Sequence, residues 1–574
     1  MKPPSIDHDL ALLKKEPQIS YFSMEIGFDS RIPTYSGGLG VLAGDTLRAC
    51  ADLEVPIVGV TLLNKKGYFR QGIDSDGNQR ELPADWNATE FMQLKGVQVS
   101  VFIEGREVWI RAWEYFIVGV TGYQVPLYFL DTHLSSNSPE DQEITSHLYG
   151  GDSCYRLTQE VVLGIGGVRL LRALGYLQIR KFHMNEGHAA LLTLDLLAQE
   201  REHGTMESKL VEAVRRKCVF TTHTPIPAGH DRFPAQLACP VLKGNFSDQE
   251  ILRICHDGEL NMTHLALDHS EYVNGVAKKH GEVSRGMFPG FAIDSITNGV
   301  RSVFWASDPM KQVFDQYLSG WRNDPFLLRN ALLIPLDEIQ KAHQQTKKEL
   351  IEYIKHNGGV GFKEDVFTIG FARRAATYKR GDLILREPAK LLEIIDKVGP
   401  LQLVYAGKAH PNDPSGKELL KRIIHVMRSI QEKIPSVYLA NYDVSLAKVL
   451  TAGVDLWLNT PRRPQEASGT SGMKASLNGV PNFSVLDGWW IEGHIEGVTG
   501  WSIGPKPKMG VEEPSDDAKD AEDLYHKLRN IILPLFYNDP AGWGRVMHHA
   551  IAINGSFFNS HRMVYQYVLR AYFS

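Results

Sequence analysis

The sequence predicts an α/β fold in which the second half of the chain forms a doubly wound parallel sheet. Four apolar segments recur there, and each ends in a polar, basic or glycine-bearing stretch before a segment long enough for a helix. The predicted strands are residues 366–371, 401–406, 437–440 and 454–459, and the helices are residues 384–397, 415–431, 444–452 and 472–478. This alternation is typical of parallel sheets with crossover helices. Such sheets bind ligands beyond the carboxyl ends of their strands, where most functional-looking residues of this half fall.

The first half is predicted to begin with a strand, a glycine-rich loop and a helix. Residues 19–24 indicate a strand, and Gly37, Gly38 and Gly40 precede a helix predicted over residues 42–53. Glycines let a ligand approach the backbone closely, and a helix start favours an anion. A ligand-binding loop and a plain tight turn both remain open for this segment.

The other elements are predicted from their apolar periodicity. Residues 55–63 indicate a buried strand, residues 66–133 an aromatic-rich β region, residues 141–173 a helical region and residues 189–200 a long apolar helix. Residues 301–330 lose strand character and are predicted to be a hinge. The final segment, residues 557–573, is a helix candidate that we expect to pack back across the molecule.

Three histidines of the first half are candidates for a site. His183 and His188 lie five residues apart, so one helical face cannot present both to a metal, and we expect no metal site. His223 directly follows a short strand predicted over residues 218–222. It lies either at the ligand-binding edge of a sheet or in the core with its polar atoms satisfied.

Composition excludes several classes of partner and site. The chain has 574 residues, which predicts roughly two to four domains. Its net charge of −5 gives no electrostatic basis for binding nucleic acid or an anionic membrane. Its five cysteines include no CxxC pair, which argues against a disulfide scaffold or a zinc ribbon. No signal-peptide or membrane-spanning run is evident, so we expect a cytoplasmic protein.

The segment QEASGTSGMKASLNG, residues 465–479, carries the chemistry that the rest of the chain serves. Its small polar residues lead into a predicted helix, an arrangement that can hold a phosphate with free backbone N–H groups. Lys474 lies in the first turn of that helix. A lysine beside a phosphate loop suggests pyridoxal 5′-phosphate (PLP), which carries both an aldehyde and a phosphate and is held as a Schiff base. The other interpretation is an ordinary loop, a helix cap and a solvated lysine.

Several further strings lie along the chain in a fixed order. They are GGLGVLAGD (37–45), YRLTQE (155–160), NEGHAAL (185–191), TTHTPIPAGHDRF (221–233), ITNGV (296–300), RRAATYKR (373–380), YAGKAHP (405–411), NYDVSLAK (441–448) and EASGTSGMKASLNGVPNFSVLDG (466–488). With these strings the chain resembles the α-glucan phosphorylases, the family of glycogen, starch and maltodextrin phosphorylases. The resemblance covers most of residues 20–480.

The resemblance implies a GT-B fold, in which two Rossmann-like domains face an interdomain active-site cleft. We expect residues 1–305 to form the first domain, residues 306–545 the PLP-binding domain and residues 546–574 a C-terminal helix that packs back on the first. The implied enzyme is a hexosyltransferase that performs retaining phosphorolysis of terminal α-1,4-linked glucosyl units. Its partners would be an α-glucan or maltodextrin, inorganic phosphate and glucose 1-phosphate.

The resemblance also assigns roles to individual residues. Lys474 would carry the Schiff base, and Thr470, Ser471, Arg373 and Tyr442 would hold the cofactor. Arg374, Lys379 and the Gly38 backbone would bind the substrate phosphate, with Tyr378 beside them. Glucose would contact Leu39, Asn298, Glu466, Ser468, Gly469 and His223, and the main-chain carbonyl of His223 would face the positive charge that develops at the anomeric carbon.

The basic loop fits the electrostatics of this reaction. Two phosphates in contact repel one another strongly in a cleft of low dielectric, so they need cations around them. Arg373, Arg374 and Lys379 supply three in one loop. Arginine can grip a phosphate with two parallel bonds, whereas lysine acts as a point charge. Taken alone, the loop would equally be a solvated basic turn.

The chain departs from the long family members in several places. Arg373 and Asp443 stand where those members usually have lysine and arginine, so we expect no direct contact between Asp443 and the cofactor phosphate. TSGMK replaces TGNMK, and Trp489 and Trp490 are not typical of the long forms. The chain is also shorter, so we expect no allosteric control of the long-form type. The preferred glucan and the choice between monomer and homodimer are left open.

Three other functions compete with phosphorolysis. A nucleotide-sugar glucosyltransferase of the glycogen synthase type would share the GT-B fold and a GGLG loop, but it has no use for a PLP lysine. A glucan-binding protein without catalysis would not need His223, Arg374, Lys379, Glu466 and Lys474 together. A dinucleotide dehydrogenase would need the full GxGxxG spacing, which GGLG lacks.

Overall fold

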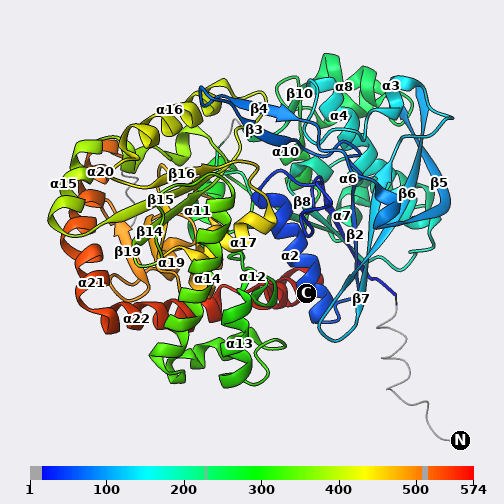
Figure 1. Cartoon of the computed structure of the whole chain (residues 1–574). Helices are drawn as coiled ribbons and strands as arrows, with labels where there is room; N and C mark the ends of the chain where they lie inside the picture. Colours follow the sequence, from blue (N-terminus) through cyan, green and yellow to red (C-terminus); the bar gives the residue numbers. More distant parts are fainter. Residues whose placement is uncertain (1–15, 227–228, 507–514, 574) are drawn as a thin grey trace, which may run out of the picture.

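The computed structural model describes residues 16–226, 229–506 and 515–573, and these form two α/β units that lie side by side (Figure 1). Each unit is built around its own mainly parallel sheet. The first half of the chain supplies one sheet and the second half supplies the other. Two Rossmann-like units that face each other form the GT-B arrangement, so the predicted fold class is confirmed.

Within the described residues, the first sheet has nine strands in the order β13-β12-β9-β8-β1-β2-β7-β6-β5. The strands are β1 (Ile19–Ser23), β2 (Ile57–Leu62), β5 (Gln93–Ile103), β6 (Arg106–Val118), β7 (Gln124–Asp131), β8 (Lys181–Asn185), β9 (Cys218–Thr221), β12 (Tyr272–Gly275) and β13 (Asp294–Ser295). Pairs from β13 to β7 are parallel, whereas β7, β6 and β5 pair antiparallel. Strands β1 and β2 are buried along their whole length, which explains their continuous apolar sequences.

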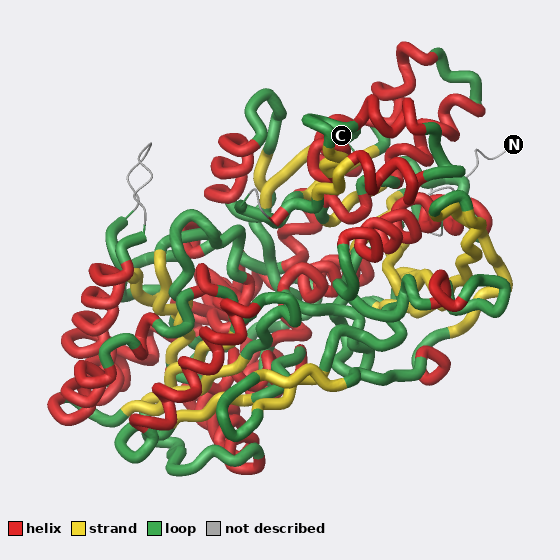
Figure 2. Tube along the Cα trace, turned by 90° about the horizontal axis from the view of Figure 1, so that it is seen from above, coloured by secondary structure: helices red, strands yellow, loops and turns green. Residues whose placement is uncertain are grey.

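The second sheet has six strands among the described residues, in the order β16-β15-β14-β17-β18-β19. The strands are β14 (Phe367–Ala372), β15 (Leu401–Ala406), β16 (Ser436–Leu439), β17 (Leu456–Asn459), β18 (Asn482–Val485) and β19 (Gly500–Ile503). All of these pairs are parallel, which confirms the predicted doubly wound sheet. Helices α15 (Pro388–Lys397), α16 (Pro414–Ile430), α17 (Val444–Gly453) and α18 (Thr470–Leu477) follow the four predicted strands. Seen from above, helices flank the strands (Figure 2).

The helical prediction for residues 141–173 is wrong in its first part. Helix α3 (Pro139–Gln142) is separated from α4 (Ser153–Val161) by a loop. In that loop Tyr149 and Gly151 have φ angles of 54° and 69°, which a helix cannot contain. Asp152 then accepts a hydrogen bond from the Tyr155 N–H at 2.9 Å and caps α4.

Several other helices begin at residues different from those predicted, among them α15, which begins at Pro388 rather than at residue 384. Helix α2 (Gly38–Asp52) begins inside the glycine cluster rather than at residue 42. Helix α6 (Leu192–Glu202) begins after a 3₁₀ turn over Gly187–Ala189. The C-terminal helix α23 (Ser560–Tyr567) begins after residue 557 because the Asn559 side chain accepts the Arg562 N–H at 2.8 Å and caps it.

The C-terminal segment returns to the first unit. Buried side chains of α23 share a core cluster with α2 and with strands of the first sheet. The Val300 N–H donates to the Phe558 carbonyl at 3.0 Å, and the Ser560 N–H donates to the Val300 carbonyl at 3.0 Å. These bonds hold the turn before residue 300 against the end of the chain. The division of domains at residues 305 and 545 stays a prediction.

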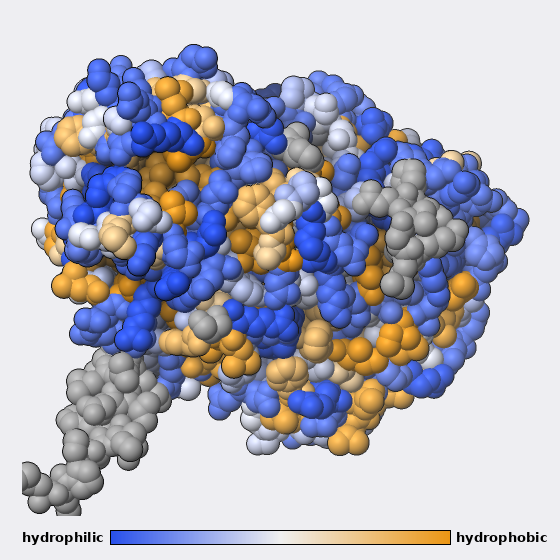
Figure 3. All heavy atoms as spheres, turned by 180° about the vertical axis from the view of Figure 1, so that it is seen from behind, coloured by the Kyte–Doolittle hydropathy of each residue, from blue (hydrophilic) through white to orange (hydrophobic). Residues whose placement is uncertain are grey.

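The surface carries mixed polarity. Seen from behind, hydrophilic residues cover most of the face, and apolar residues are scattered between them (Figure 3). None of the described helices combines the length and apolar character needed to cross a bilayer.

Candidate active site

Lys474 lies in the last turn of helix α18 and not in the first turn as predicted, because the helix begins at Thr470 rather than at residue 472. Gly469, with a φ of 91°, precedes the helix in a left-handed conformation, and α18 begins at Thr470. The lysine is buried, with an exposed fraction of 6%, and its amine lies 3.7 Å from the centre of the Trp305 ring. Burial lowers the pKa of Lys474 to about 8, and the negative charge of Asp45 opposes this shift.

Near the start of α18, the surrounding atoms leave no room for a side chain at Gly472. A Cβ on Gly472 would lie 2.3 Å from Asn482 Oδ1 and 2.8 Å from the Trp489 ring. The Ser471 hydroxyl next to it accepts the Trp457 Nε1–H at 3.1 Å. This packing fixes the loop and the first turn, and therefore the position of Lys474.

A basic cluster lies on the loop after β14, with one carboxylate in its centre. Arg373 Nη2 and Lys379 Nζ each lie 2.6 Å from Glu466 Oε2. Burial would raise the pKa of Glu466, but the two cations outweigh it and lower this pKa to about 2. Two cations, Arg373 and Lys379, therefore share one carboxylate, which leaves a net positive charge on this group of three side chains.

The third cation lies against a tyrosine. Arg374 Nη2 donates to the Tyr378 hydroxyl at 3.4 Å, and Lys379 Nζ lies 4.6 Å from the centre of the Tyr378 ring. Burial would raise the pKa of Tyr378, but Lys379 and Arg374 outweigh it, and the pKa is lower than usual. The loop thus presents two cations and an acidified phenol together.

The glycine-rich loop of the first unit is held by a buried acid. Glu25 Oε2 accepts the N–H groups of Ser36 and Gly37, the second at 3.2 Å. Gly38 begins α2, and a Cβ added there would meet no atom within 4 Å. The backbone at Gly38 is therefore open to a ligand at the positive end of a helix.

His223 follows β9 at the carboxyl edge of the first sheet. Its Nε2 lies 2.6 Å from Asn185 Oδ1, and its N–H donates to Glu186 Oε2 at 2.7 Å. Burial lowers the pKa of His223 to about 3, so the ring is neutral near pH 7. Two positions were predicted for His223, the ligand-binding edge of a sheet or a buried place with its polar atoms satisfied. The structure combines them, because His223 lies at the sheet edge and is hydrogen-bonded there.

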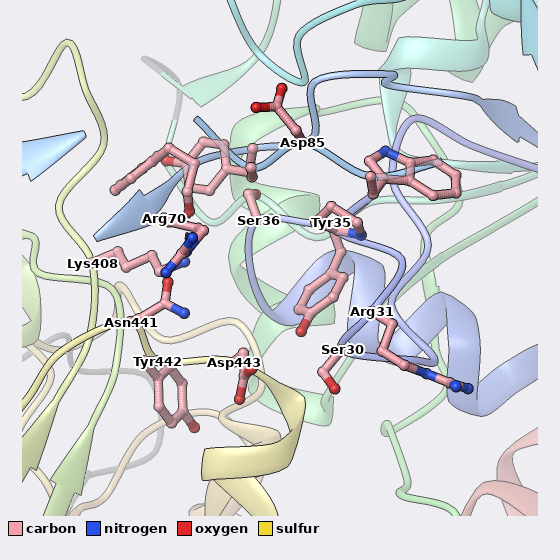
Figure 4. Close-up of a pocket in the computed structure, with 15 residues that line it drawn as sticks. Ser30, Arg31, Tyr35, Ser36, Arg70, Asp85, Lys408, Asn441, Tyr442 and Asp443 are labelled. Atoms are coloured by element: carbon pink, nitrogen blue, oxygen red, sulfur yellow. Dashed lines mark hydrogen bonds between the residues drawn. The ribbon is translucent and has the colours of Figure 1, made fainter. Parts of the chain in front are cut away.

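A cavity of about 280 Å³ lies between the two units near these loops. Figure 4 shows Tyr35 and Ser36 of the first unit opposite Lys408, Tyr442 and Asp443 of the second. Burial lowers the pKa of Lys408 to about 8. Asp443 Oδ1 accepts the Leu446 N–H at 2.8 Å and caps α17, so its carboxylate has a structural role.

Three buried polar atoms of the predicted site have no hydrogen-bond partner among the described residues. They are Arg373 Nη1, Asn298 Oδ1 and Ser468 Oγ. Buried polar groups are normally paired, so each unpaired atom is a candidate to contact a ligand. The Asn298 carbonyl is held separately by Arg562 Nη2 at 2.8 Å.

The structure brings the predicted residues together only in part. Arg373, Lys379 and Glu466 are in direct contact, as are Arg374 and Tyr378. Gly38, Leu39, His223 and Asn298 belong to the first unit, the first two in the first turn of α2 and the other two on loops after strands.

Sequence reasoning missed four residues that contact this region. Glu25, Asp45, Glu186 and Trp305 all support predicted site residues. Asp45 and Glu186 lie inside motifs that the sequence singled out, so their acidity was the available signal. Trp305 lies in a segment with no such pattern, and only the fold reveals it.

Comparison with known proteins agrees with this arrangement. Residues 230–498 match the family described as carbohydrate phosphorylase. The chain is 39% identical to a maltodextrin phosphorylase of Thermococcus litoralis, over 97% of this chain and 71% of that protein. It is 34% identical to a glycogen phosphorylase of Aquifex aeolicus, over 97% of this chain and 86% of that protein. An uncharacterized protein of Methanocaldococcus jannaschii is 31% identical over 96% of this chain and 99% of its own length. The chain therefore belongs to the carbohydrate phosphorylase family.

Proposed function

We propose that this protein is a PLP-dependent α-1,4-glucan phosphorylase that releases glucose 1-phosphate with retention of anomeric configuration. The observation that carries the proposal is the buried Lys474 amine, whose pKa burial lowers to about 8. A lysine with a lowered pKa is more often uncharged near neutral pH and can react with an aldehyde. Maltodextrin or another α-glucan is the proposed substrate, in keeping with the names of the relatives.

The residues around Lys474 fit the cofactor. The loop from Gly469 into α18 supplies backbone N–H groups at a helix start. Arg373 has a buried Nη1 without a partner among the described residues, which suits a phosphate oxygen. Thr470, Ser471, Arg373 and Tyr442 are the residues that we propose hold the group. When bound, PLP would supply its 5′-phosphate as a proton relay to the substrate phosphate.

The chain's own residues would hold and polarise the reacting groups. Arg374 and Lys379, with the Gly38 N–H, would bind the substrate phosphate and lower the repulsion between two anions. Tyr378 lies against both cations and would orient them. Glu466 balances Arg373 and Lys379, and its second oxygen would accept a glucose hydroxyl.

The first unit would supply the sugar side of the site. The neutral ring of His223 donates its Nε2–H to Asn185 Oδ1, so its Nδ1 would accept a hydrogen bond from a glucose hydroxyl. Its main-chain carbonyl would face the oxocarbenium-like carbon in the transition state. Leu39, Asn298, Ser468 and Gly469 complete the proposed glucose contacts.

The compartment and assembly are part of the same proposal. All five cysteines are free, as expected in the reducing cytoplasm that we propose. We also propose that the protein forms a homodimer. Light scattering of the purified protein would measure its assembly.

The test is the absorption spectrum before and after borohydride, read together with glucose 1-phosphate release from maltodextrin and phosphate. We expect a cofactor band that borohydride alters permanently in the wild type and that Lys474→Ala lacks. Lys448→Ala is the matched control, because Lys448 is also partly buried and lies 4.8 Å from the centre of the Phe304 ring. A wild-type protein supplied with PLP that shows no band would overturn the proposal and favour a nucleotide-sugar glucosyltransferase.

A further inference from the structure

A buried carboxylate of the first unit, that of Asp45, and the Lys474 amine of the second unit contact the same indole, that of Trp305. Asp45 belongs to α2 and is 2% exposed. Its Oδ2 accepts the Trp305 Nε1–H at 2.7 Å. The same Trp305 ring has the Lys474 amine 3.7 Å from its centre. One indole therefore contacts the carboxylate with its N–H and the amine with its ring.

The second oxygen of Asp45 is buried and has no hydrogen-bond partner among the described residues. Leaving a buried polar group unpaired costs free energy, so an unpaired carboxylate oxygen calls for an explanation. The charged groups that face Asp45 are Lys474 and Arg48. A positive charge on the Lys474 nitrogen would compensate the anion.

Arg48 makes contacts away from Asp45, and its Nη1 is buried without a hydrogen-bond partner among the described residues. Its Nη2 donates to the Phe28 carbonyl, and its guanidinium lies 3.8 Å from the centre of the Phe304 ring. No ion pair joins it to Asp45 within the described ranges. The charge of Asp45 therefore acts on two buried cations, Arg48 and Lys474, and of these Lys474 shares the Trp305 indole with it.

We propose that Asp45 is a positioning residue that favours the protonated form of the Lys474 nitrogen when the two units are closed on each other. This inference rests on the proposed function, since it takes Lys474 as the residue that carries the cofactor. A negative charge in a buried site of low dielectric stabilises a nearby cation far more than it would in water. Because α2 and α18 belong to different units, opening of the cleft would remove the effect.

The test is the pH titration of the cofactor absorption band in the holoenzyme. In Asp45→Asn the side chain keeps its shape but loses its charge, so we expect the midpoint to fall by about one pH unit, a roughly tenfold loss of proton affinity. Glu90→Gln, which removes an exposed charge of the same unit, should leave the midpoint unchanged. An unchanged midpoint in Asp45→Asn would overturn the inference.

A second variant covers the case in which Asp45→Asn does not fold. Trp305→Phe keeps an aromatic ring under the amine but removes the N–H that holds Asp45, so a smaller downward shift is expected. If neither variant moves the midpoint, Asp45 serves packing alone and the inference is wrong. Absence of the band in the wild type would instead contradict the proposed function itself.

Discussion

Lys474 is a base held where water cannot solvate its charge. Its pKa of about 8 means that, in the cofactor-free protein, burial destabilises the protonated amine relative to the uncharged amine. In the unfolded chain the pKa of lysine is near 10.4. The folded state therefore binds fewer protons than the unfolded state between these two values, and stability rises with pH across that interval.

Replacing this lysine should stabilise the cofactor-free protein. In Lys474→Met we expect the free energy of unfolding to rise by up to about 3 kcal/mol at pH 7, the equivalent of the lowered pKa. The gain should be complete below pH 8, should shrink as pH rises from 8 to 10.5, and should vanish above that pH, where neither state of the wild type is charged. Denaturant unfolding at several pH values measures it. A gain that is independent of pH would show that the amine is not the cause.

At the scale of single elements, helix α18 depends on the absence of a side chain at Gly472. The atoms that a Cβ would strike, Asn482 Oδ1 and the Trp489 ring, are themselves buried. Asn482 also holds the Gly472 carbonyl at 3.0 Å through its amide, so it cannot turn away without losing a bond. The helix start, the loop and strand β18 are thus one packed unit.

Gly472→Ala should therefore displace the first turn of α18. We expect a loss of about 1–3 kcal/mol in unfolding free energy and a weaker cofactor band. Gly286→Ala is the matched control, since Gly286 lies in helix α11 (Lys278–Met287) and a Cβ there would meet no atom within 4 Å. That control should be neutral or gain up to about 1 kcal/mol. Equal losses in both variants would contradict the packing argument.

At the scale of the whole molecule, the C-terminal helix completes the first unit. Arg562 is 5% exposed and donates to the carbonyls of Thr297 and Asn298. Burial lowers the pKa of Arg562 to about 10, so the side chain is charged at neutral pH and compensated by these carbonyls. Residues far apart in the chain therefore shape the turn that carries Asn298.

Arg562→Ala should loosen that turn and weaken glucan binding. We expect a loss of about 2–4 kcal/mol in stability, because buried hydrogen bonds to a charged group are broken. In phosphorolysis assays KM for the glucan should rise more than kcat falls. Arg329→Ala, which removes an exposed arginine, is the control and should change neither. An unchanged KM in a folded Arg562→Ala protein would separate this helix from the glucose site.

Hydrogen bonds also join the two units directly. Glu492 of the second unit accepts the Lys278 N–H at 3.0 Å and the Thr297 hydroxyl at 2.9 Å. The Val444 N–H donates to the Tyr35 hydroxyl at 2.9 Å. These bonds join the two faces of the cleft near the proposed site, so motion of one unit would be felt by residues of the other.

Elements whose signals are local could be predicted from the amino-acid sequence. Four of the six described strands of the second sheet were predictable because apolar runs with polar ends report burial and strand termini directly. The basic loop and the lysine of α18 were predictable because the residues that suggest their function are adjacent in the sequence. The loop within residues 141–173 was not, because a left-handed Tyr149 leaves no pattern in periodicity.

Only the tertiary structure decided which distant groups share an environment. Asp45, Trp305 and Lys474 are far apart in the chain, and Asp45 shows no sign in sequence of lying beside a lysine. The pairing of Glu466 with Arg373 and Lys379, and the capping role of Asp443, likewise follow from packing. The physical reason is that burial and electrostatic partnership depend on distances across the cleft, and local propensity carries no information about them.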